Sequence, residues 1–132
     1  AMVAYKQFEG MEGALYYYFG IPQNKANEWL VANHYKQFKA PPDFFTAGGM
    51  SAAIAVVEAL KKTGGKTDGD ALIEAMKGMK WESPRGPISI DPETRDIVQN
   101  IYIRKVEKVD GELYNVEFAT FEAVKDSGKT KK

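Results

Sequence analysis

Few side chains in this sequence could act as an acid or a base. Asp91, Glu93 and Asp96 cluster around a proline, and paired carboxylates catalyse acid and base steps when their environments separate their pKa values. A turn with solvated acids accounts for the same residues, because Asp-Pro is typical of turns. His34 is the only histidine and lies on the apolar side of a predicted helix, where a structural role is the commoner one. These groups fall on separate elements, so we expect no catalytic residues and no enzyme.

The run Gly64-Gly65-Lys66-Thr67 imitates the end of a phosphate-binding loop. That motif needs a glycine five positions before Gly65, where Leu60 stands, and a preceding strand, where a helix is predicted. The run is instead typical of a helix C-terminus followed by a turn. The chain has no cysteine, which excludes thiolate metal sites and disulfides, and one histidine is too few for an imidazole-rich site. We therefore expect no metal and no cofactor.

Two aromatic runs are better candidates for a binding site. Phe44, Phe45 and Thr46 fall in a predicted loop over residues 43–48, before an apolar helix, and aromatic residues on such loops often line ligand clefts. Residues 13–20, GALYYYFG, favour a buried strand because Tyr and Phe are common in strands. One set of these side chains faces inward and the other outward, so the tyrosines serve either as core or as a stacking surface for a ligand.

Three helices are predicted between residues 24 and 80. The first runs from about 24 to 39, with Asn24 as N-cap and Pro41-Pro42 as its stop. The second covers residues 49–62 and is apolar nearly all round, which is typical of a fully buried helix. The third has Asp70 as its cap, and its apolar residues follow helical spacing: Leu72, Ile73, Met76 and Met79.

The second half of the chain is typical of strands. A short strand is predicted at residues 86–90, followed by a turn at Asp91-Pro92 and a long strand at 97–109. Asp110-Gly111 is a strong hairpin signal before a last strand at 112–122, and the charged end of the chain is predicted to fray. We therefore expect a C-terminal antiparallel hairpin.

Composition excludes several classes of protein. The chain has 132 residues, with 18 Lys or Arg and 18 Asp or Glu, and a net charge of zero makes nucleic acid an unexpected partner. No apolar run approaches the roughly 20 residues that span a bilayer. The first ten residues lack the charged and apolar regions of a signal peptide. Length and composition fit one soluble globular domain.

The order of these segments resembles the C-terminal third of the extracellular solute-binding proteins of ABC importers, of the branched-chain amino-acid receptor type. The most specific parts are PDFFTAGGMSAAIAVVEALKKTGG and the RGPISID segment followed by a Q-x-x-Y-I strand. The resemblance covers most of residues 10–125. It implies an α/β fold, a fragment of the two-lobed periplasmic-binding-protein type I clamp, with three helices, a short strand and the hairpin.

The resemblance also implies a division of the chain. Residues 1–132 would be one C-terminal fragment, with a helical part at about 24–80 and a strand part at about 86–124. The stretch near 19–24 would be the second hinge crossing, residues 24–80 would belong to the N-terminal lobe, and residues near 90–97 would be the third crossing. The family's first two thirds are absent, and with them a signal peptide and the segments that hold the ligand's charged groups.

By resemblance, the complete protein would bind a small amino acid-like or aromatic acid solute by hinge closure, without chemistry, and deliver it to an ABC permease from the periplasm or the cell exterior. Phe44, Phe45 and Thr46 would contact the solute, and Tyr18, close to the crossing, is a further candidate.

Two expectations follow for the chain alone. We expect weak solute binding, because the charged anchors are missing, and association into a dimer, because apolar faces and strand edges lose their cover. The alternative interpretation is a small self-associating domain that binds a protein partner through its aromatic loop.

Overall fold

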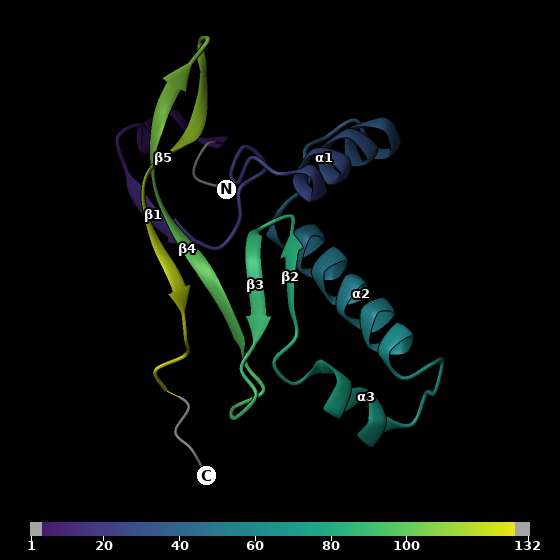
Figure 1. Cartoon of the computed structure of the whole chain (residues 1–132). Coiled ribbons are helices and arrows are strands. Elements are labelled where there is room, and N and C mark those ends of the chain that lie inside the picture. The colour runs from purple at the N-terminus through teal and green to yellow at the C-terminus, as the bar shows by residue number, and fades with distance from the viewer. Residues whose placement is uncertain (1–3, 129–132) are drawn as a thin grey trace.

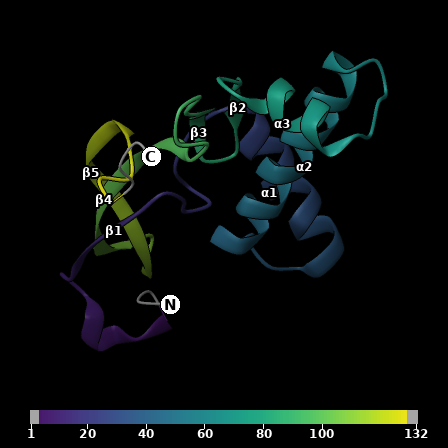
Figure 2. The ribbon, with the colours of Figure 1, turned by 90° about the horizontal axis from the view of Figure 1, so that it is seen from below.

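The computed structural model describes residues 4–128 and places a helical part beside a strand part, with two short strands between them (Figures 1 and 2). The described residues form one short 3-10 turn, three α-helices and five strands. Their bounds are η2 Lys6–Phe8, β1 Glu12–Leu15, α1 Lys25–Phe38, α2 Phe44–Lys62, α3 Gly69–Met76, β2 Lys80–Ser83, β3 Gly86–Ile90, β4 Ile97–Val109 and β5 Glu112–Val124. The expected α/β fragment with three helices and a C-terminal hairpin is confirmed.

The sheet is built around β4. Its strand order is β1-β4-β3-β2, with β5 also paired to β4, and every one of these pairs is antiparallel. Asp110 and Gly111 both have positive φ, 51° and 84°, which is the conformation that a tight hairpin turn requires. The predicted hairpin is therefore confirmed, and it projects well beyond the rest of the sheet (Figure 1).

The first helix begins and ends where the sequence predicts. The side chain of Asn24 accepts a hydrogen bond from the Asn27 main-chain N–H at 2.8 Å, which satisfies one of the free donors of the first turn. The helix ends at Lys39, which adopts a left-handed conformation with φ of 57°. His34 Nδ1 lies 2.7 Å from the Ala40 main-chain oxygen, so this histidine secures the end of α1.

Helix α2 begins five residues earlier than predicted, and the expected loop at 43–48 is wrong. Asp43 is the N-cap, and its carboxylate accepts hydrogen bonds from the Thr46 main-chain N–H at 2.9 Å and from the Thr46 hydroxyl at 3.0 Å. This cap starts the helix at Phe44, and Gly48 and Gly49 are carried inside it in spite of their weak helix propensity.

The prediction that the second helix is buried all round is also wrong. One stripe of small residues is buried, at Ala47, Ser51, Ala55 and Ala59, which follow the four-residue repeat of a helix face. Val57 on another face is 50% exposed. By length and composition α2 is apolar enough to cross a membrane, which corrects the expectation that no such run exists, although core helices of soluble proteins meet the same measure.

Two apolar clusters hold the helical part together. The first contains Tyr17, Leu30 and Ala47 and joins the N-terminal aromatic residues to α1 and α2. The second contains Ala55, Ala59 and Met79 and packs α2 against α3 and β2. The two clusters use opposite ends of the same stripe of α2, so α2 is the common support of the helical part.

The remaining differences concern the ends of elements. Asp68, not Asp70, caps α3 by accepting from the Ala71 N–H at 3.0 Å. Met79 lies beyond that helix and is buried. The strand predicted at 13–20 is limited to β1, and β2 was not predicted. The positive φ of Gly64 and Gly65 supports the interpretation of that run as a helix C-terminus.

Candidate ligand-binding site

The site is organised by residues 16–19, which we call the aromatic segment. Tyr17 turns into the helical part, where its hydroxyl donates to Asn27 Oδ1 at 2.7 Å. The Asn27 Nδ2 in turn donates to the main-chain oxygens of Phe19 and Pro22, at 2.8 and 2.9 Å. Burial raises the pKa of Tyr17 far above its ordinary value, so its phenol is a neutral donor. Asn27 therefore fixes the path of the aromatic segment.

The tyrosines on either side of Tyr17 each lie beneath an arginine. The guanidinium carbon of Arg85 is 4.8 Å from the centre of the Tyr16 ring, and that of Arg104 is 5.9 Å from the centre of the Tyr18 ring. Both distances are within the range of cation–π attraction. Two guanidinium groups therefore lie over the aromatic segment, one from the β2–β3 turn and one from β4.

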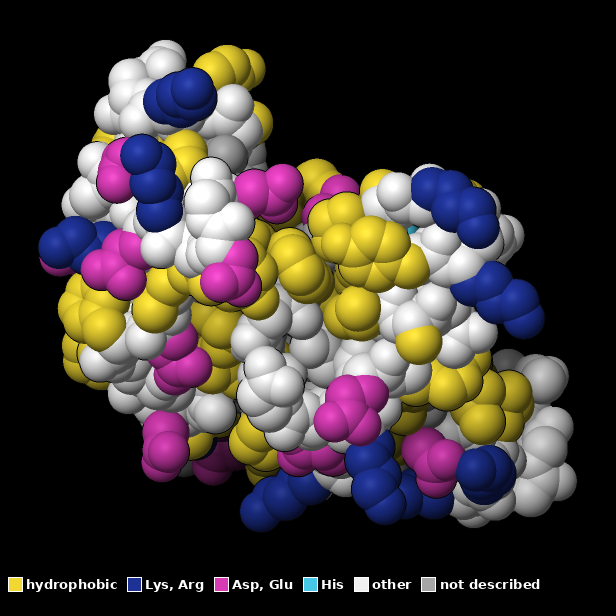
Figure 3. Space-filling model, turned by 90° about the horizontal axis from the view of Figure 1, so that it is seen from above, with side chains coloured by type: hydrophobic (Ala, Val, Ile, Leu, Met, Phe, Trp, Pro, Cys, Tyr) yellow, Lys and Arg dark blue, Asp and Glu magenta, His cyan; other side chains and the backbone are white. Residues whose placement is uncertain are grey.

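A cavity of about 520 Å³ opens beside the aromatic segment, a size typical of small-molecule sites. It lies between the helical and strand parts, and Figure 3 shows hydrophobic side chains gathered between these two sides of the molecule. Its lining combines aromatic residues, two prolines and a few polar groups: Leu15, Tyr17, Tyr18, Phe19, Pro41, Pro42, Asp43, Phe44, Arg104 and Asn115.

Arg104 is the cation of this cavity, and its charge is not neutralised within the described part of the chain. Its Nη1 donates to the Tyr17 main-chain oxygen at 3.2 Å, and its Nε is buried without a partner among residues 4–128. Glu117 faces Arg104 across the hairpin but instead accepts a hydrogen bond from Thr120. Burial lowers the pKa of Arg104, yet a guanidinium stays charged in proteins. A ligand carboxylate would supply the missing partner.

Asn115 is the second polar group with unused bonding capacity. The residue lines the cavity and is only 3% exposed, and its Oδ1 has no partner within residues 4–128. Buried side-chain amides are normally hydrogen-bonded. The cavity therefore contains an unneutralised guanidinium and an unpaired amide oxygen. Both side chains lie on the same face of the hairpin, since Asn115 lies opposite Val106, two residues from Arg104.

The structure separates the four residues that the sequence singles out. Tyr18 and Phe44 line the cavity, and Phe44 is held by the Tyr16 hydroxyl, which donates to its main-chain oxygen at 3.1 Å. Phe45 is 74% exposed, and its ring lies against that of Phe44, with ring centres 4.2 Å apart. Thr46 serves the N-cap of α2.

Sequence reasoning missed Arg104 and Asn115. The sequence held a signal for Arg104, because this residue stands between two apolar residues, Tyr102 and Val106, at the two-residue spacing of one strand face. The structure buries both Tyr102 and Val106. A charged residue on the buried face of a strand is unusual enough to mark a functional candidate. Asn115 has no comparable signal, because the pattern of residues in β5 does not indicate which face of that strand is buried.

A second cavity, of about 500 Å³, lies over β2, β3 and β4. Its lining includes Trp81 and Ile88 but also two carboxylates, Glu82 and Glu122, against the single ammonium of Lys80. This charge balance disfavours an anionic ligand.

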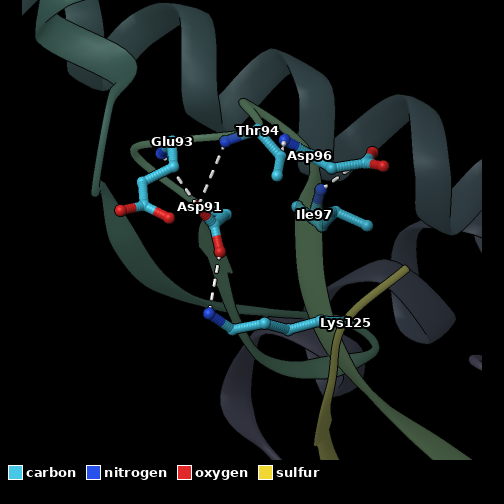
Figure 4. Close-up of polar contacts among 6 residues, drawn as sticks. All are labelled: Asp91, Glu93, Thr94, Asp96, Ile97 and Lys125. Carbon is cyan, nitrogen blue, oxygen red and sulfur yellow. Dashed lines mark hydrogen bonds and ion pairs between the residues drawn. The ribbon is translucent and has the colours of Figure 1, made fainter. Parts of the chain in front are cut away.

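Residues 91–96, the acidic turn, are structural. The Asp91 carboxylate accepts from the N–H groups of Glu93 and Thr94, at 2.8 and 3.2 Å, and from Lys125 Nζ at 2.8 Å (Figure 4). These bonds lower the pKa of Asp91 to about 2, the Lys125 contact contributing most. Asp91 is 7% exposed, so the expectation of solvated acids is wrong for it. A carboxylate with so low a pKa is a poor general base at neutral pH.

Comparison with known proteins gives this cavity a context. The periplasmic binding protein family model matches residues 2–112. The chain belongs to the periplasmic binding protein family. A solute-binding protein of an ABC transporter from Rhodopseudomonas palustris BisB5, solved with 3,4-dihydroxybenzoic acid, is 64% identical, with a TM-score of 0.88. The match covers 95% of this chain and 34% of that protein.

Two further relatives of the periplasmic binding protein family are similar to this chain. A solute-binding protein from Rhodopseudomonas palustris HaA2, solved with p-hydroxybenzoic acid, is 39% identical with a TM-score of 0.83, over 93% of this chain and 34% of its own. The Leu/Ile/Val-binding protein homolog 6 of Brucella abortus (strain 2308) is 49% identical over 86 residues, 64% of this chain and 22% of its own. The chain thus spans about a third or less of these relatives.

Proposed function

We propose that this chain is part of the solute-binding component of an ABC importer, and that it supplies one wall of a site for a small aromatic carboxylic acid. The observation that carries the proposal is the unneutralised guanidinium of Arg104 within a cavity walled by Tyr18, Phe19 and Phe44. Arginine suits carboxylates because its planar donors match the two carboxylate oxygens. The aromatic walls offer edge and face contacts to a ring.

The relatives support the same ligand class. Both solved relatives described above were crystallised with hydroxylated benzoic acids, which combine one carboxylate with one ring. The chain covers only part of either relative, and the rest of the receptor would complete the site and close over the ligand as the two lobes move. The chain alone is therefore expected to bind weakly, as the sequence also predicts.

The remaining features of the proposal concern the whole protein. The periplasmic binding protein family consists of solute receptors rather than enzymes, and the complete protein would act in the periplasm or at the cell exterior. A signal peptide would direct it there, and an ABC permease would accept the ligand from its closed form. The partner-binding alternative depended on an exposed aromatic loop, and it loses support because residues 44–46 open a helix and Phe44 lines the cavity.

An amino acid is the second candidate ligand. Asp43 lines the cavity together with Arg104, so a carboxylate and a guanidinium could face the two charges of an amino acid. The Brucella relative is named as a Leu/Ile/Val-binding homologue. The Asp43 carboxylate, however, already accepts two hydrogen bonds from Thr46, which favours the aromatic acid.

Isothermal titration of the receptor polypeptide that contains these residues, with benzoate and with leucine, tests the proposal. We expect benzoate to bind and the R104Q variant to bind it about 10- to 100-fold more weakly, because a hydrogen bond to a charged group contributes about 1.5–3 kcal/mol.

The matched control is R85Q, since Arg85 is also a half-buried arginine above a tyrosine but lies outside the cavity lining. It should leave benzoate affinity unchanged. Binding of leucine without benzoate would assign the site to amino acids, and equal losses in both variants would remove Arg104 from the site.

A further inference from the structure

Arg104 and Asn115 stand at two separate places on one wall of the cavity. They lie on neighbouring strands of the hairpin, with Asn115 opposite Val106 and Arg104 opposite Glu117. Residues in this diagonal relation across an antiparallel pair are about 7–8 Å apart. The register is regular here, because the nearest irregularity falls between Ile103 and Arg104. One ligand with polar groups at two ends of a ring could meet both side chains.

The chemistry of the two groups differs. Arg104 presents donors only, which suits the carboxylate assigned to it above. The Asn115 amide offers one acceptor and two donors, and its buried oxygen has no hydrogen-bond partner in residues 4–128. A phenolic hydroxyl both donates and accepts, so it can pair with either end of the amide. A simple hydrocarbon substituent would leave the amide oxygen unpaired, at a cost of about 1–3 kcal/mol.

Asn115 shares the lining of the cavity with the aromatic side chains of Tyr18, Phe19 and Phe44. Tyr18 and Phe19 pack against Tyr114, the residue before Asn115, with ring centres 5.0 and 5.5 Å apart. Asn115 is only 3% exposed, so its amide is placed to contact a ligand in the cavity rather than bulk solvent.

We infer that Asn115 is the specificity residue of the site and selects aromatic acids that carry a ring hydroxyl opposite the carboxylate. This inference rests on the proposed function, since it takes the carboxylate of the ligand to lie at Arg104. Arg104 provides affinity for any aromatic acid of suitable size, and Asn115 separates the hydroxylated from the unhydroxylated members. Asn115 acts by hydrogen bonding alone and takes part in no covalent step.

The test measures the affinities of 4-hydroxybenzoate, 4-methylbenzoate and benzoate for the receptor polypeptide and its N115L variant by isothermal titration. The methyl group has nearly the size of the hydroxyl but forms no hydrogen bond. We expect the wild type to bind 4-hydroxybenzoate about tenfold more tightly than 4-methylbenzoate. In N115L this preference should vanish or reverse.

The outcomes separate the two proposals. If the wild type binds none of the three acids, the proposed function fails. If it binds them without preferring the hydroxyl, or if N115L keeps the preference, the role of Asn115 is overturned while the aromatic acid site stands. N115L removes a buried amide whose oxygen is unpaired and should fold, because Leu has a similar size. Should it fail to fold, the comparison of the three acids on the wild type still decides whether the site prefers a hydroxyl.

Discussion

The phenol of Tyr114 fills the space in which a side chain at residue 20 would lie. A Cβ built on Gly20 would stand 1.5 Å from the Tyr114 hydroxyl oxygen and 2.5 Å from its ring. This contact joins the end of the aromatic segment to β5 and brings Tyr114 against Tyr18 and Phe19. Residue 20 must therefore be a glycine, because any Cβ atom there would overlap the Tyr114 phenol. The missing side chain allows β5 to pack against the aromatic segment.

Substitution of Gly20 by alanine should therefore destabilise the chain. The added methyl group must push Tyr114 away, and overpacking of this kind costs about 1–3 kcal/mol. Urea denaturation monitored by circular dichroism measures the change. Gly49→Ala is the control, because nothing lies within 4 Å of its Cβ position in α2, and it should raise stability by about 0.5–1 kcal/mol.

A double-mutant cycle sharpens this prediction. In a Tyr114→Ala background the space beside residue 20 is empty, so the additional effect of Gly20→Ala should largely disappear. An unchanged effect in that background would mean that the glycine is needed for another reason.

The Tyr17 to Asn27 hydrogen bond gives a second prediction. Tyr17→Phe removes a hydroxyl that donates at 2.7 Å to a buried acceptor, and an unpaired buried acceptor costs about 1–3 kcal/mol. The thermal midpoint of the variant should fall. Tyr5→Phe, at a position that is more than half exposed, should leave the midpoint unchanged. Similar midpoints for both variants would show that Asn27 does not need the Tyr17 hydroxyl.

Local signals in the sequence predicted much of this fold. Asn24 and Asp110-Gly111 act through hydrogen bonds and backbone conformations within a few residues, so their neighbours alone determine α1 and the hairpin turn. Non-local pairing determined the rest. Strand β2 is stabilised by its ladder with β3, in which Trp81 faces Ile88, and no periodicity in four residues could have predicted it.

The site was predictable only in part for the same reason. Phe44 and Tyr18 were singled out by their aromatic character, and both line the cavity. Phe45 was grouped with them because residues 43–48 were expected to be a loop, but a helix turns consecutive residues about 100° apart and sends Phe45 outward. Arg104 and Asn115 enter the cavity through the register of β4 and β5, which depends on the folded hairpin.

The isolated chain offers a surface for self-association. Strand β5 pairs only with β4 among residues 4–128, and it carries two exposed aromatic residues, Phe118 and Phe121. An edge strand with exposed aromatic residues readily pairs with another copy. We expect the 132-residue chain to be a dimer at micromolar concentration, as measured by size-exclusion chromatography with light scattering.

Two substitutions test where this contact lies. The pair Phe118→Lys and Phe121→Lys should shift the chain to a monomer, because charges on an edge strand oppose pairing. Trp29→Lys, on the exposed face of α1, is the control and should remain dimeric. A wild-type chain with the mass of a monomer would contradict the prediction outright.

The Asp91 to Lys125 ion pair predicts a dependence of stability on pH. The pKa of Asp91 is about 2 in the fold, below its ordinary value of 3.8, so protons bind more readily to the unfolded chain. The stabilisation is therefore fully present above about pH 4 and is lost as the pH falls toward 2. The same contact raises the pKa of Lys125 above 10.5, so its contribution is present below pH 10.5 and is lost only in stronger base.

Asp91→Asn isolates this charge, because the amide oxygen can still accept from the N–H groups of Glu93 and Thr94 but no longer attracts the Lys125 ammonium. Thermal midpoints of the wild type and D91N should differ by a constant amount from pH 5 to 9. That difference should shrink as the pH falls from about 4 to 2, where the wild-type carboxylate is protonated. Lys125→Met should reproduce most of the loss near neutral pH, since Lys125 is the largest influence on the Asp91 pKa. A difference that stays constant down to pH 2 would show that the acidic turn is held by its main-chain hydrogen bonds and that the ion pair adds nothing.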